Sequence, residues 1–394
     1  MTKKVVTLRG SPQFATVSLF SGAMGLDLGV MQAGMNVVVS QDSDKWCAET
    51  IRTNGHTVVE GDIRELLQRD PSCSFLLAPS STKTEDVFAV IGGPPCQAYS
   101  TAGKRRGTGD SRGNLFEQFA QVVDTLRPRF FVMENVKGLL SMPSIEGDKQ
   151  STPLLSVILK RLTKLGYHVI YGILDAVHYG VPQFRERLVI IGSRDNEAIF
   201  LPAPTHFHLH QSAEMRWATL GSAISDLADN PGPGSRFSDT LVQYLRKVPE
   251  GGNWRSLPPK DQKAAMGGAY ESGGGKVGFY RRLSLAQPSP TLVTSPTQKA
   301  TLFCHPRHDR PLSIREYARI QQFPDNWKIA GGMAECYKQI GNAVPVGLGR
   351  AIGQMLMAVA SGNSEVKVRR HRGTSVHARY AVAGQLSLME GISD

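Results

Sequence analysis

Cys96 stands directly after two glycines and two prolines, in the stretch Gly92-Gly93-Pro94-Pro95-Cys96. Proline fixes φ and has no N–H group, so this stretch cannot continue a central strand or a helix. The apolar run 87–91 before it predicts a strand whose end presents a thiol. A thiolate is a strong nucleophile, but a free cysteine is as often a small buried hydrophobic residue. The stretch alone leaves both interpretations open.

A glycine turn and two acids form a second candidate ligand site. The turn Phe20-Ser21-Gly22-Ala23-Met24-Gly25 lies between a predicted strand and a predicted helix, so its backbone can approach a ligand at a helix N-terminus. Asp42 and Asp62 end the next two predicted strands, where an acid can bind ribose hydroxyls. Because the turn does not match G-x-G-x-x-G, the set indicates an adenosine-type ligand without a pyrophosphate. Either acid by itself is better explained as a helix cap.

The elements that position these residues alternate along the chain. Apolar runs predict strands, and apolar residues at helical spacing predict the helices between them. The predicted strands are 16–20, 37–40, 57–60, 87–91, 130–133, 168–174 and 188–191, and the predicted helices include 26–33, 63–67, 115–126 and 154–165. We expect residues 71–85 to form a loop. The alternation predicts an α/β fold with a doubly wound, mostly parallel sheet, which binds ligands at the carboxyl ends of its strands.

The composition changes after Phe200. Residues 201–276 are rich in Pro, Gly, His and Ser and show little periodicity, which predicts a second, smaller, loop-rich domain. Helical spacing returns at 314–320 and 346–356, and residues beyond Ser361 are polar and basic. We therefore expect a catalytic domain of residues 1–200 and 331–362, a second domain of residues 201–330, and a basic, partly disordered tail of residues 363–394.

The bulk composition limits the class of protein. The 394 residues carry a net charge of +11, which favours a polyanionic partner, nucleic acid before a membrane surface. We expect no membrane-spanning run and no signal peptide. The five cysteines contain no C-x-x-C pair, which favours a reducing cytoplasm over a disulfide framework or zinc ribbon. His206, His208 and His210 alternate, but no complete ligand set accompanies them, so we expect surface histidines and no metal.

Several stretches together resemble the DNA (cytosine-5)-methyltransferases, the S-adenosylmethionine-dependent enzymes of bacterial restriction-modification systems. The stretches occur in the family's order and cover most of the chain outside 201–276. They are Phe20-Ser21-Gly22 with Gly25, Gly93-Pro94-Pro95-Cys96-Gln97, Asp110-Ser111-Arg112-Gly113, Glu134-Asn135-Val136, Gln183-Phe184-Arg185-Glu186-Arg187, 315–324 and Gln339-Ile340-Gly341-Asn342-Ala343-Val344. The resemblance implies a Rossmann-like methyltransferase fold, with target recognition assigned to residues 201–330.

The chemistry of cytosine explains the catalytic residue types. Carbon 5 is too weak a nucleophile to attack a sulfonium methyl group, whereas thiolate addition to carbon 6 gives an enamine whose carbon 5 can attack. Cys96 is the candidate nucleophile, and Glu134 is the candidate for protonating N3. A cation near O2 would stabilise the negative charge of the adduct. The resemblance implies that Arg187 contacts the base and that Arg185 supports the site around Cys96.

The resemblance also implies the cofactor and DNA contacts. The S-adenosylmethionine pocket maps onto Phe20, Gly22, Gly25, Asp42, Asp62, Ile63, Pro95 and Asn342. The target base must be flipped out of the duplex, and a basic, glycine-rich loop at 98–113 suits closure over DNA. The candidate DNA-binding residues are Lys104, Arg105, Arg106 and Arg112 in this loop, Thr291 as a phosphate ligand, and Arg236, Asn253, Trp254 and Arg255 for base recognition. Met24 and Ser43 depart from the family pattern.

Four other functions fit the sequence less well. An amino-methyltransferase needs no cysteine, and Gly93 and Cys96 around the two prolines argue against it. A non-catalytic DNA-binding module would show a degraded catalytic set, and a thiol hydrolase would need a fitting histidine. An RNA substrate stays open. We expect double-stranded DNA as the partner of a cytoplasmic monomer that pairs functionally, without a stable complex, with a cognate restriction endonuclease.

Overall fold

The computed structural model describes residues 14–95, 115–142, 152–272 and 276–362. Predictions that fall elsewhere lie outside these described residues. They concern the candidate nucleophile, the basic residues of the 98–113 loop and the C-terminal tail, namely Cys96, Lys104, Arg105, Arg106, Arg112 and 363–394.

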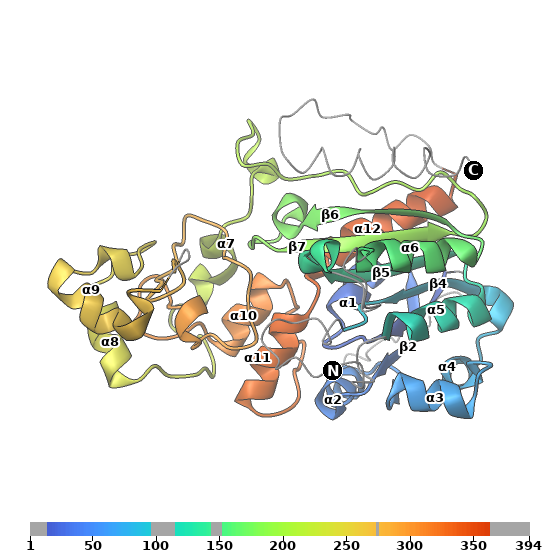
Figure 1. Ribbon diagram of the computed structural model, residues 1–394, viewed down its shortest axis with the longest axis horizontal. Coiled ribbons are helices and arrows are strands. Elements are labelled where there is room, and N and C mark those ends of the chain that lie inside the picture. Colours follow the sequence, from blue (N-terminus) through green and yellow to red (C-terminus); the bar gives the residue numbers. More distant parts are fainter. Residues whose placement is uncertain (1–13, 96–114, 143–151, 273–275, 363–394) are drawn as a thin grey trace, which may run out of the picture.

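A seven-stranded sheet lies at the centre of the larger part of the molecule (Figure 1). Its strands are β1 (Ala15–Leu19), β2 (Asn36–Asp42), β3 (Val58–Glu60), β4 (Val87–Gly92), β5 (Phe130–Val136), β6 (His168–Asp175) and β7 (Glu186–Ser193). Their order is β3-β2-β1-β4-β5-β7-β6, and the first five are parallel. Strand β7 runs antiparallel to both β5 and β6. The predicted mostly parallel α/β sheet is therefore confirmed, with β7 as the exception.

Helices cover both faces of the sheet because its central strands are apolar on both sides. Every residue of β4 is buried, as expected of a central parallel strand. One face packs against α3 (Ile63–Arg69), α4 (Ser74–Leu77), α5 (Leu115–Leu126) and α6 (Leu154–Lys164). The other face packs against α1 (Gly25–Gln32) and α12 (Val346–Ala360). A Cβ at Gly29 would overlap the carbonyl oxygen of Val346, so the contact between α1 and α12 requires glycine there.

Two local predictions were wrong. The expected loop 71–85 contains α4 and two short 3-10 turns, because Leu76 and Leu77 are buried against the sheet. The strand expected to end before Glu134 continues through Val136, since its last three residues pair with Leu188, Val189 and Arg187 of β7. Glu134 thus lies within a paired strand, where its backbone is fixed.

One described stretch, Met333–Ala360, is apolar and long enough to cross a membrane by length and composition, contrary to the expectation of none. It comprises α11 (Met333–Asn342) and α12, which Pro345 separates. Of its apolar window, 61% is buried inside the protein. This burial assigns the stretch to the core.

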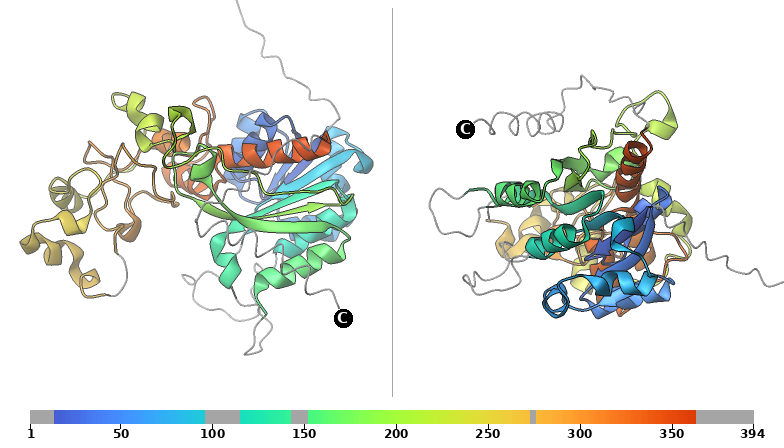
Figure 2. Two further views of the ribbon diagram at one scale, coloured as in Figure 1. Left: turned by 90° about the horizontal axis from the view of Figure 1, so that it is seen from above. Right: turned by 90° about the vertical axis from the view of Figure 1, so that its right-hand side faces the viewer.

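Residues 201–330 form few regular elements and extend away from the sheet. Their helices are α7 (Leu220–Ile224), α8 (Asp239–Leu245), α9 (Pro259–Met266) and α10 (Ile314–Ile320). Helices α8 and α9 lie at the end of the molecule far from the strands (Figures 1 and 2). Helices α7 and α10 instead share a core with α11, α1 and α2 (Lys45–Thr53). The proposed domain boundary at 330 stays a prediction. The shared core is continuous across that position, with α7 and α10 before it and α11 after it.

Candidate active site

The ends of β4 and β5 and the start of β7 meet at one edge of the sheet. Gly92 at the end of β4 pairs with Met133, and Val136 at the end of β5 pairs with Arg187. Because β7 is antiparallel, its first residues lie at the carboxyl edge of the parallel strands. The edge therefore collects Glu134, Arg187 and the turn that leads to Cys96.

Glu134 and Arg187 form a buried ion pair at this edge. The Nε atom of Arg187 lies 2.7 Å from Oε1 of Glu134, and the two side chains are only 11% and 10% exposed. Burial raises the pKa of the Glu134 carboxyl, while the nearby charges of Arg187 and Arg185 oppose that rise. The carboxyl is thus held in one place and kept closer to protonation than its two arginine neighbours alone would allow.

Two contacts attach the Gly-Pro-Pro turn to this pair. A Cβ at Gly93 would lie 2.9 Å from Oε2 of Glu134, so glycine allows the carboxyl to approach the backbone. The Nδ2 amide of Asn135 donates to the carbonyl oxygen of Pro94 at 2.9 Å. Asn135 is therefore a positioning residue, a role that sequence reasoning missed. The signal available in the sequence was that Asn135 directly follows Glu134.

Arg185 joins three segments from inside the protein. It is 1% exposed, and its guanidinium donates to the carbonyl oxygens of Leu292 at 3.0 Å and Gly341 at 2.7 Å. Its backbone N–H donates to Oδ1 of Asp175 at 2.8 Å. Burial lowers the pKa of Arg185, as does the charge of Arg187. Arg185 thus fixes the start of β7 against α11 and the 289–293 loop. Its support of the site around Cys96 stays a prediction.

Thr291 lies next to the Arg185 contacts. Its hydroxyl donates to the carbonyl oxygen of Phe184 at 2.7 Å, and the residue is exposed. The following N–H, of Leu292, donates to Oε1 of Gln183 at 2.8 Å. The backbone around Thr291 is therefore held beside the 183–187 segment, and its contact with a phosphate stays a prediction.

Asp42 holds the glycine turn on the other half of the edge. Its Oδ2 accepts the N–H of Gly22 at 2.8 Å, and its Oδ1 accepts the N–H of Asp44 at 2.8 Å. Burial raises the pKa of Asp42. Gly22 has φ +55°, and no atom lies within 4 Å of the place that a Cβ would occupy, so backbone conformation rather than space favours glycine. The open space beside Gly22 leaves room for a ligand to approach the turn.

The remaining predicted cofactor residues differ in their surroundings. Asp62 caps α3 by accepting the N–H of Arg64 and also forms an ion pair with the Arg64 side chain. Gly25 is required by packing, since a Cβ there would overlap the carbonyl oxygen of Val344. Ile63 is buried, Phe20 is half-buried, and Pro95 and Asn342 are exposed. Their contact with a cofactor stays a prediction.

The four cysteines that the structure describes are buried. Burial raises the pKa of Cys73 to about 11 and of Cys304 to about 12. It also raises the pKa of the Cys47 and Cys336 thiols. These thiols are therefore poor nucleophiles at neutral pH.

The candidate base-recognition residues lie in the 201–330 region. Asn253 caps the 3-10 turn Trp254–Ser256, and the Arg255 guanidinium lies 5.6 Å from the centre of the Trp254 ring. Arg236 is exposed. The structure does not bring these residues together with Glu134 through any described contact.

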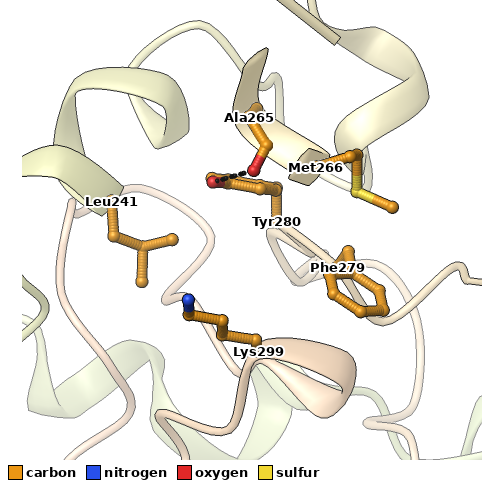
Figure 3. Close-up of a pocket in the computed structure, with 6 residues that line it drawn as sticks. All are labelled: Leu241, Ala265, Met266, Phe279, Tyr280 and Lys299. Atoms are coloured by element: carbon orange, nitrogen blue, oxygen red, sulfur yellow. Dashed lines mark hydrogen bonds between the residues drawn. The ribbon is translucent and has the colours of Figure 1, made fainter. Parts of the chain in front are cut away.

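A small cavity of about 60 Å³ lies in the same region. Leu241, Ala265, Met266, Phe279, Tyr280 and Lys299 line it (Figure 3). The Tyr280 hydroxyl donates to the carbonyl oxygen of Ala265 at 2.8 Å. None of these lining residues belongs to the predicted site.

Two of the alternating histidines, His208 and His210, contact aromatic rings. The centre of the His208 ring lies 4.9 Å from that of Trp217, and the His210 ring stacks on Phe207. Among the described residues, no group of three or more His, Cys, Asp or Glu side chains could hold a metal ion.

Comparison with known proteins identifies the family. Residues 14–358 match the family model of the C-5 cytosine-specific DNA methylases. The chain is 40% identical over 358 residues to the type II methyltransferase M.Sau96I of Staphylococcus aureus, covering 90% of this chain and 78% of that protein. It is 39% identical over 354 residues to the type II methyltransferase M.PspPI of a Psychrobacter species, covering 88% and 80% respectively.

A solved structure has the same fold. It is a putative DNA modification methyltransferase encoded within an Escherichia coli prophage, superposed with a TM-score of 0.60 at 22% identity over 89% of this chain and 100% of that one. The resemblance seen in the sequence is confirmed, and the chain belongs to the C-5 cytosine-specific DNA methylase family as a DNA (cytosine-5)-methyltransferase.

Proposed function

We propose that this enzyme methylates cytosine at a specific sequence in duplex DNA, through a covalent bond from Cys96 to carbon 6 of a flipped-out base. The observation that carries the proposal is the buried Glu134–Arg187 pair beside Gly93 and Pro94. Gly93 and Pro94 come just before Cys96 in the chain. Glu134 and Arg187, which lie beside them, then supply an acid and a cation for the ring that the thiolate attacks.

Each residue then has a separate task. The Cys96 thiolate adds to carbon 6 while Glu134 holds a proton at N3 and Arg187 faces O2, so the ring electrons move to carbon 5. Carbon 5 then forms a bond to the methyl carbon of the donor as the bond from that carbon to sulfur breaks, and the donor's sulfur leaves as a neutral thioether. Loss of the carbon 5 proton and departure of the thiolate restore the ring double bond and free Cys96. The raised pKa of Glu134 supports its role as the group that carries the proton at N3.

We infer that S-adenosylmethionine is the methyl donor and that it carries the methyl group on a sulfonium. The Gly22 turn is held by Asp42 and has open space beside it, where an adenosine-type ligand can approach. Asn342 and Pro95 are exposed and accessible to it. Residues Phe20, Gly25, Asp62 and Ile63 complete the proposed pocket.

We also propose that the enzyme acts in the cytoplasm, as a monomer on DNA, and protects host DNA in a restriction-modification system. The type II names of its relatives and its net charge of +11 support this. Thiolate addition to carbon 6 by itself also suits a cytosine in RNA. In this proposal residues 201–330 recognise the target sequence, Thr291 contacts a phosphate, and the loop with Lys104, Arg105, Arg106 and Arg112 closes over the DNA.

The test uses duplex DNA containing 5-fluorocytosine together with S-adenosylmethionine. Fluorine at carbon 5 blocks the final proton loss, so the enzyme should remain covalently attached to the DNA. Cys96→Ser should abolish the adduct, and Cys336→Ala should retain it because that thiol is buried and its pKa is raised. An adduct that survives Cys96→Ser, or no adduct with any sequence-diverse DNA pool, would overturn the proposal.

A further inference from the structure

A buried acid beneath the glycine turn takes no part in the chemistry described above. Asp27 lies in the first turn of α1 and is 1% exposed. Its Oδ1 accepts the hydroxyl of Ser40 on β2 at 2.9 Å, whereas its Oδ2 has no partner of ordinary hydrogen-bond geometry among the described residues, although the Ser18 hydroxyl lies near the carboxylate. A buried carboxylate oxygen without a partner is costly, so its presence calls for an explanation.

Hydroxyl groups connect Asp27 to the turn. The Ser21 hydroxyl, within the turn, donates to Oγ of Ser18 on β1 at 2.8 Å. Ser18 and Ser40 both stabilise the ionised form of Asp27. The next N–H of the turn, that of Gly22, donates to Asp42. Two acids therefore hold the same turn, Asp27 from below through serines and Asp42 from the side.

Asp27 and Asp42 form no ion pair in the described part of the chain. Burial raises the pKa of Asp27 to about 6, and the charge of Asp42 adds to that rise. At pH 8 the Asp27 carboxyl beneath the turn is thus ionised, and backbone and hydroxyl dipoles offset its charge. The N-terminus of α1 contributes a partial positive charge to that offset.

A purely structural role would not require the charge. An asparagine has nearly the same shape as Asp27 and can accept the Ser40 hydroxyl equally well, without the cost of burying an ion. What the ion adds is a field at the turn, in a region where low polarity weakens screening. The ligand that gains from such a field is a cation.

We propose that Asp27 is a positioning residue whose charge makes the turn favour the cationic cofactor over its neutral product. This inference rests on the proposed use of S-adenosylmethionine. Methyl transfer removes the sulfonium charge and leaves S-adenosylhomocysteine, a thioether with no charge at sulfur. The field of Asp27 therefore stabilises the positive sulfur of the bound methyl donor but not the neutral sulfur of the product. This difference assists product release.

The test measures equilibrium binding of S-adenosylmethionine and S-adenosylhomocysteine by titration calorimetry at pH 8. Asp27→Asn should weaken binding of the methyl donor by about three- to tenfold and change product binding less than about twofold, as expected for one unscreened charge at a distance of several ångströms. Ser40→Ala is the matched control. It removes the hydrogen bond but keeps the charge, so it should leave the ratio of the two affinities unchanged.

The outcomes separate the two proposals. Wild-type protein that binds neither ligand would contradict the proposed cofactor. Wild-type protein that binds both, with Asp27→Asn weakening both equally or Ser40→Ala changing the ratio as much, would overturn only the role of the charge. If Asp27→Asn does not fold, as judged by thermal melting, Asp27→Ser removes the same charge with a smaller side chain and should shift the ratio in the same direction.

Discussion

Glu134 and Asp27 are buried acids on two halves of one sheet edge, and they differ in what neutralises them. Glu134 pairs with Arg187 at 2.7 Å, whereas Asp27 is hydrogen-bonded by Ser40 and has no ion pair in the described part of the chain. A cationic partner fixes the position of a carboxyl and cancels its field. A hydroxyl partner fixes the position but leaves the field intact, available to a charged ligand.

The two halves also differ in how the backbone approaches the acid. At Gly93 the acid itself occupies the space that a side chain would need. At Gly22 the space is open, and only φ +55° favours glycine. The first half is shaped by close packing around a reactive geometry. The second is shaped by backbone conformation beside open space.

The difference between the two acids is tested most severely by Arg187→Ala, which makes Glu134 resemble Asp27 but without hydroxyl partners. The change leaves a carboxyl buried and uncompensated, so we expect a loss of about 3–5 kcal/mol in the free energy of unfolding. Urea denaturation measures it. Glu134→Gln combined with Arg187→Ala should recover part of that loss. If the double variant is less stable than Arg187→Ala by the full cost of Glu134→Gln, the pair is not coupled.

Arg185→Met should have the next largest effect on stability. The variant keeps much of the volume but loses two charged donors to the carbonyls of Leu292 and Gly341, for a cost of about 3 kcal/mol. Because the segment around Thr291 loses its attachment, binding of duplex DNA should weaken together with the melting temperature. Arg185→Lys can satisfy one carbonyl and should fall between the two. Unchanged DNA binding in Arg185→Met would contradict the supporting role.

Asp27→Asn isolates the charge of the second acid through its dependence on pH. The folded protein holds the Asp27 proton with a pKa of about 6, against an ordinary value of 3.8, so ionisation destabilises the fold as pH rises through that interval. The variant should therefore gain up to about 3 kcal/mol over wild type at pH 8 and nothing at pH 4. Thermal or urea unfolding of both proteins across this range measures the difference. A constant difference would show that the charge of Asp27 carries no such cost.

Gly93→Ala and Gly22→Ala should have the smallest effects on stability and different effects on function. Gly22→Ala strains a left-handed residue and should cost about 1 kcal/mol, with cofactor affinity reduced modestly. Gly93→Ala has no such strain but displaces the Glu134 carboxyl, so methyl transfer should fall more than about tenfold at nearly unchanged stability. Turnover and melting temperature measured together distinguish them. Equal losses of activity in both variants would remove the distinction between the two halves.

Local sequence patterns were sufficient for the strand and helix alternation and for the order of the motifs. They carry this information because side-chain periodicity, proline and glycine act over a few residues. Predicted helices such as 115–126 are confirmed by α5. The family was also identifiable at this level, since several motifs in order are more specific than any one.

Which charges are paired became known only from the folded arrangement. Glu134 and Arg187 meet because β7 runs antiparallel to β5, a direction that no local pattern specifies. Asn135 gains a role because Pro94 lies beside it, and Asp62 is seen to cap α3 while forming an ion pair with Arg64. Asp27 looked like any polar residue on a helix until its burial was known. The charge state and partners of an acid depend on segments distant in the chain, and these come together only in the folded protein.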